Sequence, residues 1–443
     1  MSVARLAREL RAGELSPREA VQSYLDRIEQ NDGELNAYIT VRAEEALAEA
    51  DALEAAAERG PLWGVPVAIK DVIDVAGTRT TAASKILSDN VATRDATAVE
   101  RLRRAGAVVL GKLNTHEFAF GAMTTSPHFG PAHNPWSLDR ICGGSSGGSG
   151  AAAAADLAAG TLGTDTAGSI RIPACLCGVT GLRPSSGLVP NRGVVPVSWT
   201  FDTVGPIARS AEDCALLLDA IAGTGVVVDG GVEGLRIGVA EALLDRAEPR
   251  VAEAIRAGVA TLAALGATAE PVEVPMLAES STIKQLQMLP EATNVHLEWM
   301  RTRLGDYGAD VRARLLAGLF LPATAYVTGM RARRVYCDGV SRLFERFDVL
   351  AAPAMPVVAP RIGEHDVELG GERVAYRLAL MPFNSPWSLA GLPVLSVPCG
   401  FVDGLPVGLA LVGRRQAEES VLRAGHAFQR ATHWHERRPP DPV

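Results

Sequence analysis

The chain has few residues of several types, and each shortage excludes a class of protein. Six cysteines in 443 residues show no disulfide-framework spacing, and the pair Cys175 and Cys177 has no second pair at a zinc spacing. No run reaches the roughly 18 apolar residues that a membrane-spanning helix requires. Basic residues are not in excess, since 43 Lys and Arg stand against 51 Asp and Glu. We therefore expect no metal, no membrane contact and no nucleic-acid partner.

Lysine is the scarcest charged residue in the chain. The four lysines are Lys70, Lys85, Lys112 and Lys284. Lys70 ends the apolar run 65–69 and Lys112 follows a similar run, so a strand could carry either side chain into a core. Lys85 and Lys284 stand in mixed polar surroundings. Most lysines are surface ammonium groups, and by composition alone that remains the simpler interpretation of all four.

Apolar residues are abundant enough for a large core, at 47% of the chain. Residues 1–60 have helical periodicity and no apolar segment typical of a secretory signal, so we expect a cytoplasmic protein. Helices and strands then alternate. We expect a strand and turn at 64–77, and a helix, a Gly stop and a buried strand within 97–114. Further strands are expected at 235–240, near 268–274, at 347–356 and at 391–400, with helices from 151, at about 250–265 and across 282–346. This alternation predicts an α/β protein with a mixed or mostly parallel sheet.

Two Gly- and Ser-rich segments, 143–150 and 161–173, are the most informative part of the sequence. Neither contains a phosphate-binding loop or a dinucleotide-binding glycine pattern. Residues 144–148 match the G-x-S-x-G string of a nucleophile elbow, with Ser146 at its centre. The preceding residues do not resemble a buried strand, which disfavours an α/β-hydrolase. A serine nucleophile can instead use a neutral lysine as its base, if burial lowers the pKa of that lysine.

Three strings of the sequence resemble the amidase signature family. They are GVPVAIKD (64–71), GGSSGGSGAAAA (143–154) and GTDTAGSIRIPACLCGVTGLRPS (163–185). Further similarity at 134–136, 201–210 and 404–414 extends it over nearly the whole chain. The resemblance implies a large mixed central sheet with helices on both faces. It also implies a single amidase domain over 1–443, with a helical segment to about 60, a signature core at about 60–215, a loop at about 223–234 and an α/β part at 235–443.

The resemblance also implies a catalytic triad and its surroundings. Matched by motif, Lys70 is the base, Ser145 the relay serine after a cis Gly144–Ser145 peptide, and Ser169 the nucleophile. The backbone N–H groups of the turn before Ser169 would form the oxyanion hole, at Thr166, Ala167 and Gly168. The family usually has glycine where this chain has Ala167.

Three further residues are expected to support this site. Ser146 would hydrogen-bond near the triad or only within its loop, and Asp165 would fix the turn or cap a helix. Arg171 would orient the loop by ion pairing, an interpretation we favour over contact with an anionic substrate.

Three functions fit these residues. The first is a free-standing hydrolase of small neutral amides, anilides or carbamates, which acts without a cofactor as a monomer or homodimer. The second is the amidase (glutaminase) subunit of a glutaminyl-tRNA amidotransferase. That subunit usually has an acidic residue near the position of Met381, and residues 376–393 contain none. The third, a catalytically inactive scaffold, is disfavoured because all three triad positions are filled.

Overall fold

A computed structural model describes residues 2–56 and 58–440 of the chain. Its centre is an eleven-stranded sheet in the order β1-β3-β2-β8-β10-β9-β16-β17-β13-β11-β12. These strands are β1 (Tyr38–Val41), β2 (Pro66–Lys70), β3 (Val108–Leu113), β8 (Gly160–Asp165), β9 (Thr180–Arg183), β10 (Thr203–Ala208), β11 (Arg236–Val239), β12 (Thr268–Pro271), β13 (Val349–Pro353), β16 (Val394–Val402) and β17 (Leu405–Gly413).

The sheet is mixed, as the sequence predicted. β2 runs parallel to both β3 and β8, and β11 runs parallel to β12 and β13. Between β8 and β13 in the sheet order, each strand pairs antiparallel with the next. Every residue of β2, β3 and β8 is buried, which is typical of strands covered on both faces.

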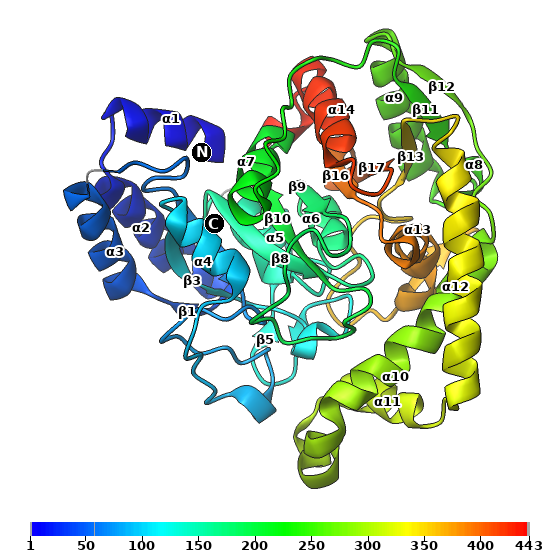
Figure 1. The fold of residues 1–443 in the computed structure, drawn as a ribbon, viewed down its shortest axis with the longest axis horizontal. Coiled ribbons are helices and arrows are strands. Elements are labelled where there is room, and N and C mark those ends of the chain that lie inside the picture. The colour runs from blue at the N-terminus through cyan, green and yellow to red at the C-terminus, as the bar shows by residue number, and fades with distance from the viewer. Residues whose placement is uncertain (1, 57, 441–443) are drawn as a thin grey trace.

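Helices cover both faces of this sheet (Figure 1). Two groups of helices pack against the central strands. In the first group α5 contacts α6, and in the second α14 contacts both α7 and α9. The helices are α1 (Val3–Ala12), α2 (Pro17–Leu35), α3 (Ala43–Ala55), α4 (Thr97–Arg104), α5 (Gly147–Ala154), α6 (Arg171–Leu176), α7 (Ala211–Ala222), α8 (Glu241–Leu244), α9 (Pro249–Ala264), α10 (Leu277–Arg303), α11 (Ala309–Leu319), α12 (Ala323–Leu343), α13 (Tyr376–Ala390) and α14 (Glu418–Ala431).

Short elements connect these parts. Three two-stranded sheets pair β4 with β5, β6 with β7 and β14 with β15. Their bounds are β4 (Thr125–Ser126), β5 (Gly130–Pro131), β6 (His133–Asn134), β7 (Ser137–Ile141), β14 (Asp366–Leu369) and β15 (Glu372–Ala375), and the 3-10 turns are η1 (Lys85–Leu87), η2 (Glu117–Ala119), η3 (Leu304–Asp306) and η4 (Trp434–Glu436).

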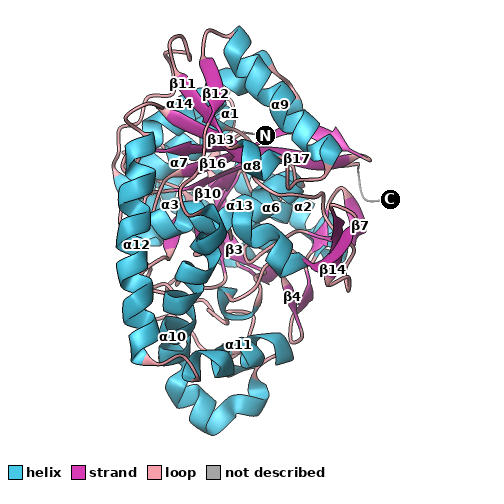
Figure 2. Ribbon diagram, turned by 90° about the vertical axis from the view of Figure 1, so that its right-hand side faces the viewer, coloured by secondary structure: helices cyan, strands magenta, loops and turns pink. Residues whose placement is uncertain are grey.

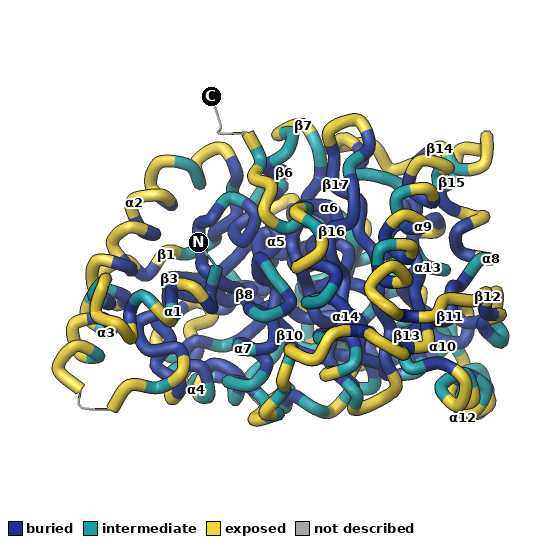
Figure 3. The backbone as a smooth tube through the Cα atoms, turned by 90° about the horizontal axis from the view of Figure 1, so that it is seen from above, coloured by how far each residue is buried: buried dark blue, intermediate teal, exposed yellow. Residues whose placement is uncertain are grey.

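The long helix α10 contacts α11, α12 and α13, and α10 and α11 lie at one end of the molecule (Figure 2). Within the described part of the chain, no single helix is long and apolar enough to cross a membrane. The pair α11 and α12, bent by 95°, meets that test by length and composition only. Figure 3 shows burial concentrated along the central strands, with exposed backbone on α2, α3 and α12.

Most expected elements are present, and two expectations were wrong. Residues 38–41 form β1 inside the N-terminal segment predicted to be helical, because this run of β-branched and aromatic residues pairs with β3 at the sheet edge. The Ala-rich helix begins at Gly147 rather than at residue 151. Residues 223–234 lie between α7 and β11 and contain no helix or strand.

Candidate active site

Lys70 is the last residue of β2, and the parallel neighbour β8 brings Thr164 beside it. The Lys70 Nζ atom lies 2.7 Å from Ser145 Oγ and 2.8 Å from Thr164 Oγ1. Its side chain is fully buried. Desolvation lowers the pKa of Lys70 to about 7, while the more distant Asp165 and Asp202 oppose that shift. A large fraction of Lys70 is therefore a neutral amine at neutral pH.

Ser145 follows a cis peptide bond from Gly144, as predicted. Its carbonyl oxygen accepts hydrogen bonds from the backbone N–H of His116 and from two threonine hydroxyls, those of Thr115 and Thr124. A Cβ atom at Gly144 would lie 2.7 Å from the backbone nitrogen of Met123. This position therefore requires glycine, and the surrounding chain fixes the Ser145 side chain toward Lys70.

Ser169 stands at the end of the turn that follows β8, and it lines a pocket with Gly144. Its carbonyl oxygen accepts the Ser146 N–H at 3.2 Å, which joins the two Gly- and Ser-rich segments. The Ser169 hydroxyl makes no hydrogen bond with any other residue that the structure describes. The serine predicted as nucleophile thus presents an uncommitted hydroxyl to the pocket.

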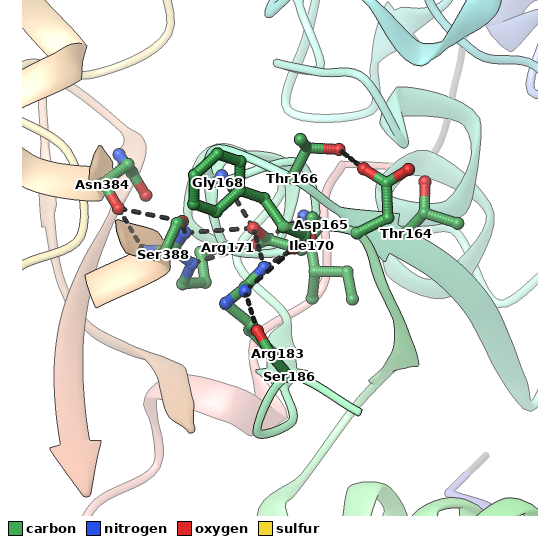
Figure 4. Close-up of polar contacts among 12 residues, drawn as sticks. Thr164, Asp165, Thr166, Gly168, Ile170, Arg171, Arg183, Ser186, Asn384 and Ser388 are labelled. Carbon is green, nitrogen blue, oxygen red and sulfur yellow. Dashed lines mark hydrogen bonds and ion pairs between the residues drawn. The ribbon is translucent and has the colours of Figure 1, made fainter. Parts of the chain in front are cut away.

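The turn before Ser169 is held by the buried carboxylate of Asp165 (Figure 4). Asp165 accepts hydrogen bonds from the backbone N–H groups of Gly168 and Ile170, at 2.8 and 3.2 Å. It also pairs with two buried guanidinium groups, Arg171 at 2.9 Å and Arg183 at 3.0 Å. Despite desolvation, these cations hold the pKa of Asp165 well below its usual range. Asp165 therefore remains ionised, and it fixes the turn as predicted.

Arg171 extends this network to α13, which agrees with the structural role favoured from the sequence. Its guanidinium donates to the Ser388 hydroxyl at 2.7 Å and to the Asn384 carbonyl at 3.2 Å (Figure 4). Ser146 stays within its own region: its hydroxyl donates to the Thr164 carbonyl at 3.2 Å and accepts the Thr164 N–H at 3.3 Å. Both residues position the site rather than face the pocket.

The structure changes the expected set of oxyanion donors. The Gly168 N–H already donates to Asp165 at 2.8 Å and Gly168 does not line the pocket, so the oxyanion role expected of it stays a prediction with less support than that of its neighbours. Thr166, Ala167 and Ser169 do line the pocket, and their backbone N–H groups have no other partner in the described structure. Gly168 has φ +117°, whereas Ala167 lies outside the left-handed region, so the alanine is tolerated in the turn.

Three residues near the site were not found from the sequence. Thr164 contacts Lys70, and Arg183 is the second partner of Asp165. Asp202, which immediately precedes β10, accepts a 2.5 Å hydrogen bond from the Thr166 hydroxyl, and burial raises its pKa to about 6. Thr164 lies directly before Asp165 in the sequence, which is a local signal for it. Arg183 and Asp202 had no such signal, because their contacts depend on which strands become neighbours in the sheet.

The pocket beside Ser169 has about 540 Å³ of space between its atoms, part of it open to solvent. The lining comes from η2 and the loop after it, from the segment before α5, from the Ser169 turn and α6, from the loop before β10 and from helices α10, α11 and α13. The lining residues are Ala119, Phe120, Gly121, Ala122, Gly144, Thr166, Ala167, Ser169, Ile172, Val197, Lys284, Gln285, Met288, Arg314, Arg377, Leu380, Met381 and Ser385. Over residues 2–56 and 58–440, no group of three His, Cys, Asp or Glu side chains could hold a metal ion.

The four lysines occupy four different environments. Lys85 is exposed and pairs with Asp306. Lys112 is buried, but it forms a 2.9 Å ion pair with the buried Asp71. Lys70 contacts only hydroxyl groups, and a free amine there can accept a proton. The fourth, Lys284, is buried against the pocket rather than at the surface, contrary to what its polar surroundings in the sequence suggested.

Replacing Asp165 by asparagine is expected to destabilise the protein by about 3–5 kcal/mol, because two buried guanidinium groups would lose their only carboxylate. Denaturant unfolding of Asp165→Asn would measure this loss. The control is Asp51→Asn, which breaks the exposed 2.5 Å pair with Arg18 and should cost less than about 1 kcal/mol. Equal effects of the two substitutions would contradict the structural role of Asp165.

A mixed eleven-stranded sheet that brings a buried lysine onto a cis-peptide serine, next to a pocket serine, defines the class of amidase-signature hydrolases. The chain belongs to the Amidase family, whose model matches residues 19–422. The family expected from the sequence is thus confirmed, and with it a hydrolase that acts on carbon–nitrogen bonds.

The individual relatives differ in their activities, so they limit the possible substrates of this chain only in part. The chain is 40% identical to a Moorella thermoacetica protein named as a subunit of glutamyl-tRNA(Gln) amidotransferase, over 96% of this chain and 95% of that protein. A solved structure described as an amidase has TM-score 0.93 and 34% identity, over 97% of this chain and 99% of the other. Another, from work on a vestigial protein complex and the origins of an s-triazine catabolic enzyme, has TM-score 0.93 and 38% identity, over 97% and 98%.

Proposed function

We propose that this protein hydrolyses the C–N bond of small amides through an acyl-enzyme on Ser169. The observation that carries the proposal is the 2.7 Å contact between the buried amine of Lys70 and the hydroxyl of Ser145, at a pocket where Ser169 is uncommitted. Amides, anilides and carbamates all present the carbonyl carbon, oxygen and nitrogen that this chemistry needs. The expectation of anilide or carbamate preference rests on the apolar lining alone.

The reaction has two halves. Ser169 Oγ attacks the carbonyl carbon, while its proton passes to Ser145 and the Ser145 proton passes to neutral Lys70. The C–N bond then breaks, and the proton returns from Lys70 through Ser145 to the departing nitrogen. This leaves an ester between Ser169 and the acyl group. A water molecule hydrolyses that ester by the same relay and regenerates the free serine.

The developing negative oxygen would be held by backbone N–H groups at the turn. The available donors are the N–H groups of Ala167 and Ser169, with that of Thr166 beside them, because the Gly168 N–H already donates to the Asp165 carboxylate. Each donor of this kind contributes roughly 2.7–4 kcal/mol to the transition state. The Asp165 network with Arg171 and Arg183 keeps these amides in place before substrate arrives.

The pH dependence follows from the lysine. Lys70 must be neutral to accept a proton, and its pKa is lowered to about 7, so kcat/KM is expected to rise through about pH 7 and reach a plateau above it. Steady-state rates on one neutral amide between about pH 5.5 and 9 would measure the profile. A neutral substrate removes its own titration from the result. A rate that stays flat over this range contradicts a lysine base.

The amidase subunit of a glutaminyl-tRNA amidotransferase is the second candidate. Sequence similarity favours it over any carbamate or anilide specificity, since relatives named as subunits of glutamyl-tRNA(Gln) amidotransferase reach 40% identity over nearly the full chain. Such a subunit would release ammonia from glutamine and would act with partner chains. The pocket gives it less support, because Met381 stands in the lining and no Asp or Glu side chain of the described residues does.

Kinetics and purification would separate the two candidates. The purified chain would be assayed with glutamine, asparagine, simple amides, anilides and aryl carbamates, and its native partners would be identified after affinity purification. A free-standing amidase should act alone, with its highest kcat/KM on a substrate other than glutamine. Preference for glutamine or asparagine, together with stoichiometric partner chains, would replace this proposal with the amidotransferase subunit.

A further inference from the structure

The lining of the pocket beside Ser169 is rich in basic side chains. It contains Lys284 from α10, Arg314 from α11 and Arg377 from α13, and no Asp or Glu side chain of the described chain lines the pocket with them. The protein as a whole has a net charge of −8. The local charge of the pocket is therefore opposite in sign to that of the molecule.

Lys284 is the most buried of these basic side chains. It is only 2% exposed, and within the described residues it makes no hydrogen bond or ion pair. Its Nζ atom lies 5.7 Å from the centre of the Phe201 ring. Burial lowers the pKa of Lys284 well below its usual value, and the nearby Asp165 does not offset this because Arg171 and Arg183 already neutralise that carboxylate.

Arg314 and Arg377 differ in their partners. Arg314 pairs with Asp310 and lies over the Phe120 ring, 4.8 Å from its centre. The same Asp310 carboxylate also contacts His116 at 3.0 Å. Arg377 lines the pocket and is exposed, and it has no hydrogen bond or ion pair with any residue in the described ranges, although the charge of Asp310 acts on it at longer range. Lys284 and Arg377 thus form no ion pair with the residues that the structure describes.

We propose that the substrate is an amide that carries a carboxylate, which Lys284 and Arg377 bind. This rests on the proposed function and departs from the neutral substrate expected from the sequence. A carboxylate in the pocket would supply the ion-pair partner that both side chains lack. Its negative charge would favour the protonated form of Lys284, which burial alone disfavours, and charge-assisted hydrogen bonds of this kind are the strong ones. A zwitterion such as glutamine fits less well, because its ammonium group would meet only cations and neutral groups.

Matched substrates test the charge directly. The first set compares ω-amic acids (malonamate, succinamate and glutaramate) with straight-chain primary amides of the same chain length, which places the carboxylate on the acyl side. The second set compares N-acetyl amino acids with their methyl esters, which places it on the amine side. Glutamine is included because it is glutaramate with an added ammonium group. We expect at least one carboxylate set to exceed its neutral partners by about tenfold or more in kcat/KM, with glutaramate ahead of glutamine.

Two variants then locate the effect. Lys284→Met and Arg377→Leu keep apolar volume and remove the charge, and each should reduce the ratio of carboxylate to neutral kcat/KM to near one. Their controls are Lys85→Met and Arg373→Leu, which remove exposed charges that do not line the pocket and should leave the ratio unchanged. Circular dichroism would verify that each variant folds, and the ratio within one variant is independent of the amount of active enzyme.

The outcomes distinguish this inference from the proposed function. Neutral partners hydrolysed as well as both carboxylate sets, or glutamine ahead of glutaramate, would overturn the inference while amide hydrolysis stands. A carboxylate preference that survives both variants would also overturn it, because the anion would then bind elsewhere. No hydrolysis of any amide, with no acylation of Ser169, would instead refute the proposed function.

Discussion

Ser169→Ala is expected to abolish amide hydrolysis, with a fall in kcat of roughly 10³-fold or more. The substitution removes the hydroxyl that would form the acyl-enzyme and leaves the rest of the relay in place. It should not disturb the fold, because that hydroxyl makes no hydrogen bond with the described residues around it. Initial rates on any amide that the native enzyme cleaves would measure the loss, and mass spectrometry after treatment with a serine-reactive phosphonate would identify the labelled residue.

A second serine provides the control for this experiment. Ser88→Ala removes an exposed hydroxyl that only donates to the Lys85 carbonyl, so activity and labelling should match the native enzyme. The phosphonate should modify Ser169 in both the native protein and this control. Labelling that persists in Ser169→Ala, on Ser145, Ser146 or another serine, would assign the nucleophile elsewhere.

Lys70→Met is expected to have the next largest effect, lowering kcat/KM by several orders of magnitude. Methionine retains most of the apolar stem but has no amine to accept the proton from Ser145. The fold should survive, because the substitution removes a buried amine that is costly to desolvate. Steady-state rates over the full pH range would measure the loss of activity in Lys70→Met. Unfolding curves for the native protein and the variant would show whether the fold is retained.

The matched control is Lys85→Met, at an exposed lysine paired with Asp306. It should retain native rates and the native rise with pH. The residual activity of Lys70→Met should in turn lose that rise, because the titrating group is gone. A variant that keeps both its rate and its pH dependence would show that another residue accepts the proton.

The sequence predicted the candidate site well because its parts are local strings. Lys70 ends a buried apolar run, and Ser145 and Ser169 each lie in a Gly- and Ser-rich segment that matches the family. The positions of Thr164, Arg183 and Asp202 depend on which strands become neighbours in the sheet, and no local pattern specifies that. The engagement of the Gly168 N–H by Asp165 is likewise a matter of turn geometry, which the string of residues does not determine.

The burial of Lys284 could not be predicted from its local sequence either. It sits in a long helix whose neighbours in the sequence are polar, so its surroundings suggested a surface lysine. The helix packs against α11, α12 and α13, and this packing buries the Lys284 side chain against the pocket. At the N-terminus, the four residues of β1 were hidden within helical surroundings because a short edge strand depends on its partner, here β3.

Helix α13 serves two purposes with its two halves. Its first half contributes Arg377 and Met381 to the pocket, whereas its second half contributes Ser385 and also holds the Arg171 guanidinium through Asn384 and Ser388. Substitutions in the first half can therefore alter which amide is accepted without loosening the turn that carries Ser169. A single helix thus separates the choice of substrate from the bond-breaking chemistry, which gives protein engineers, and evolution, a short stretch in which selectivity can be changed on its own.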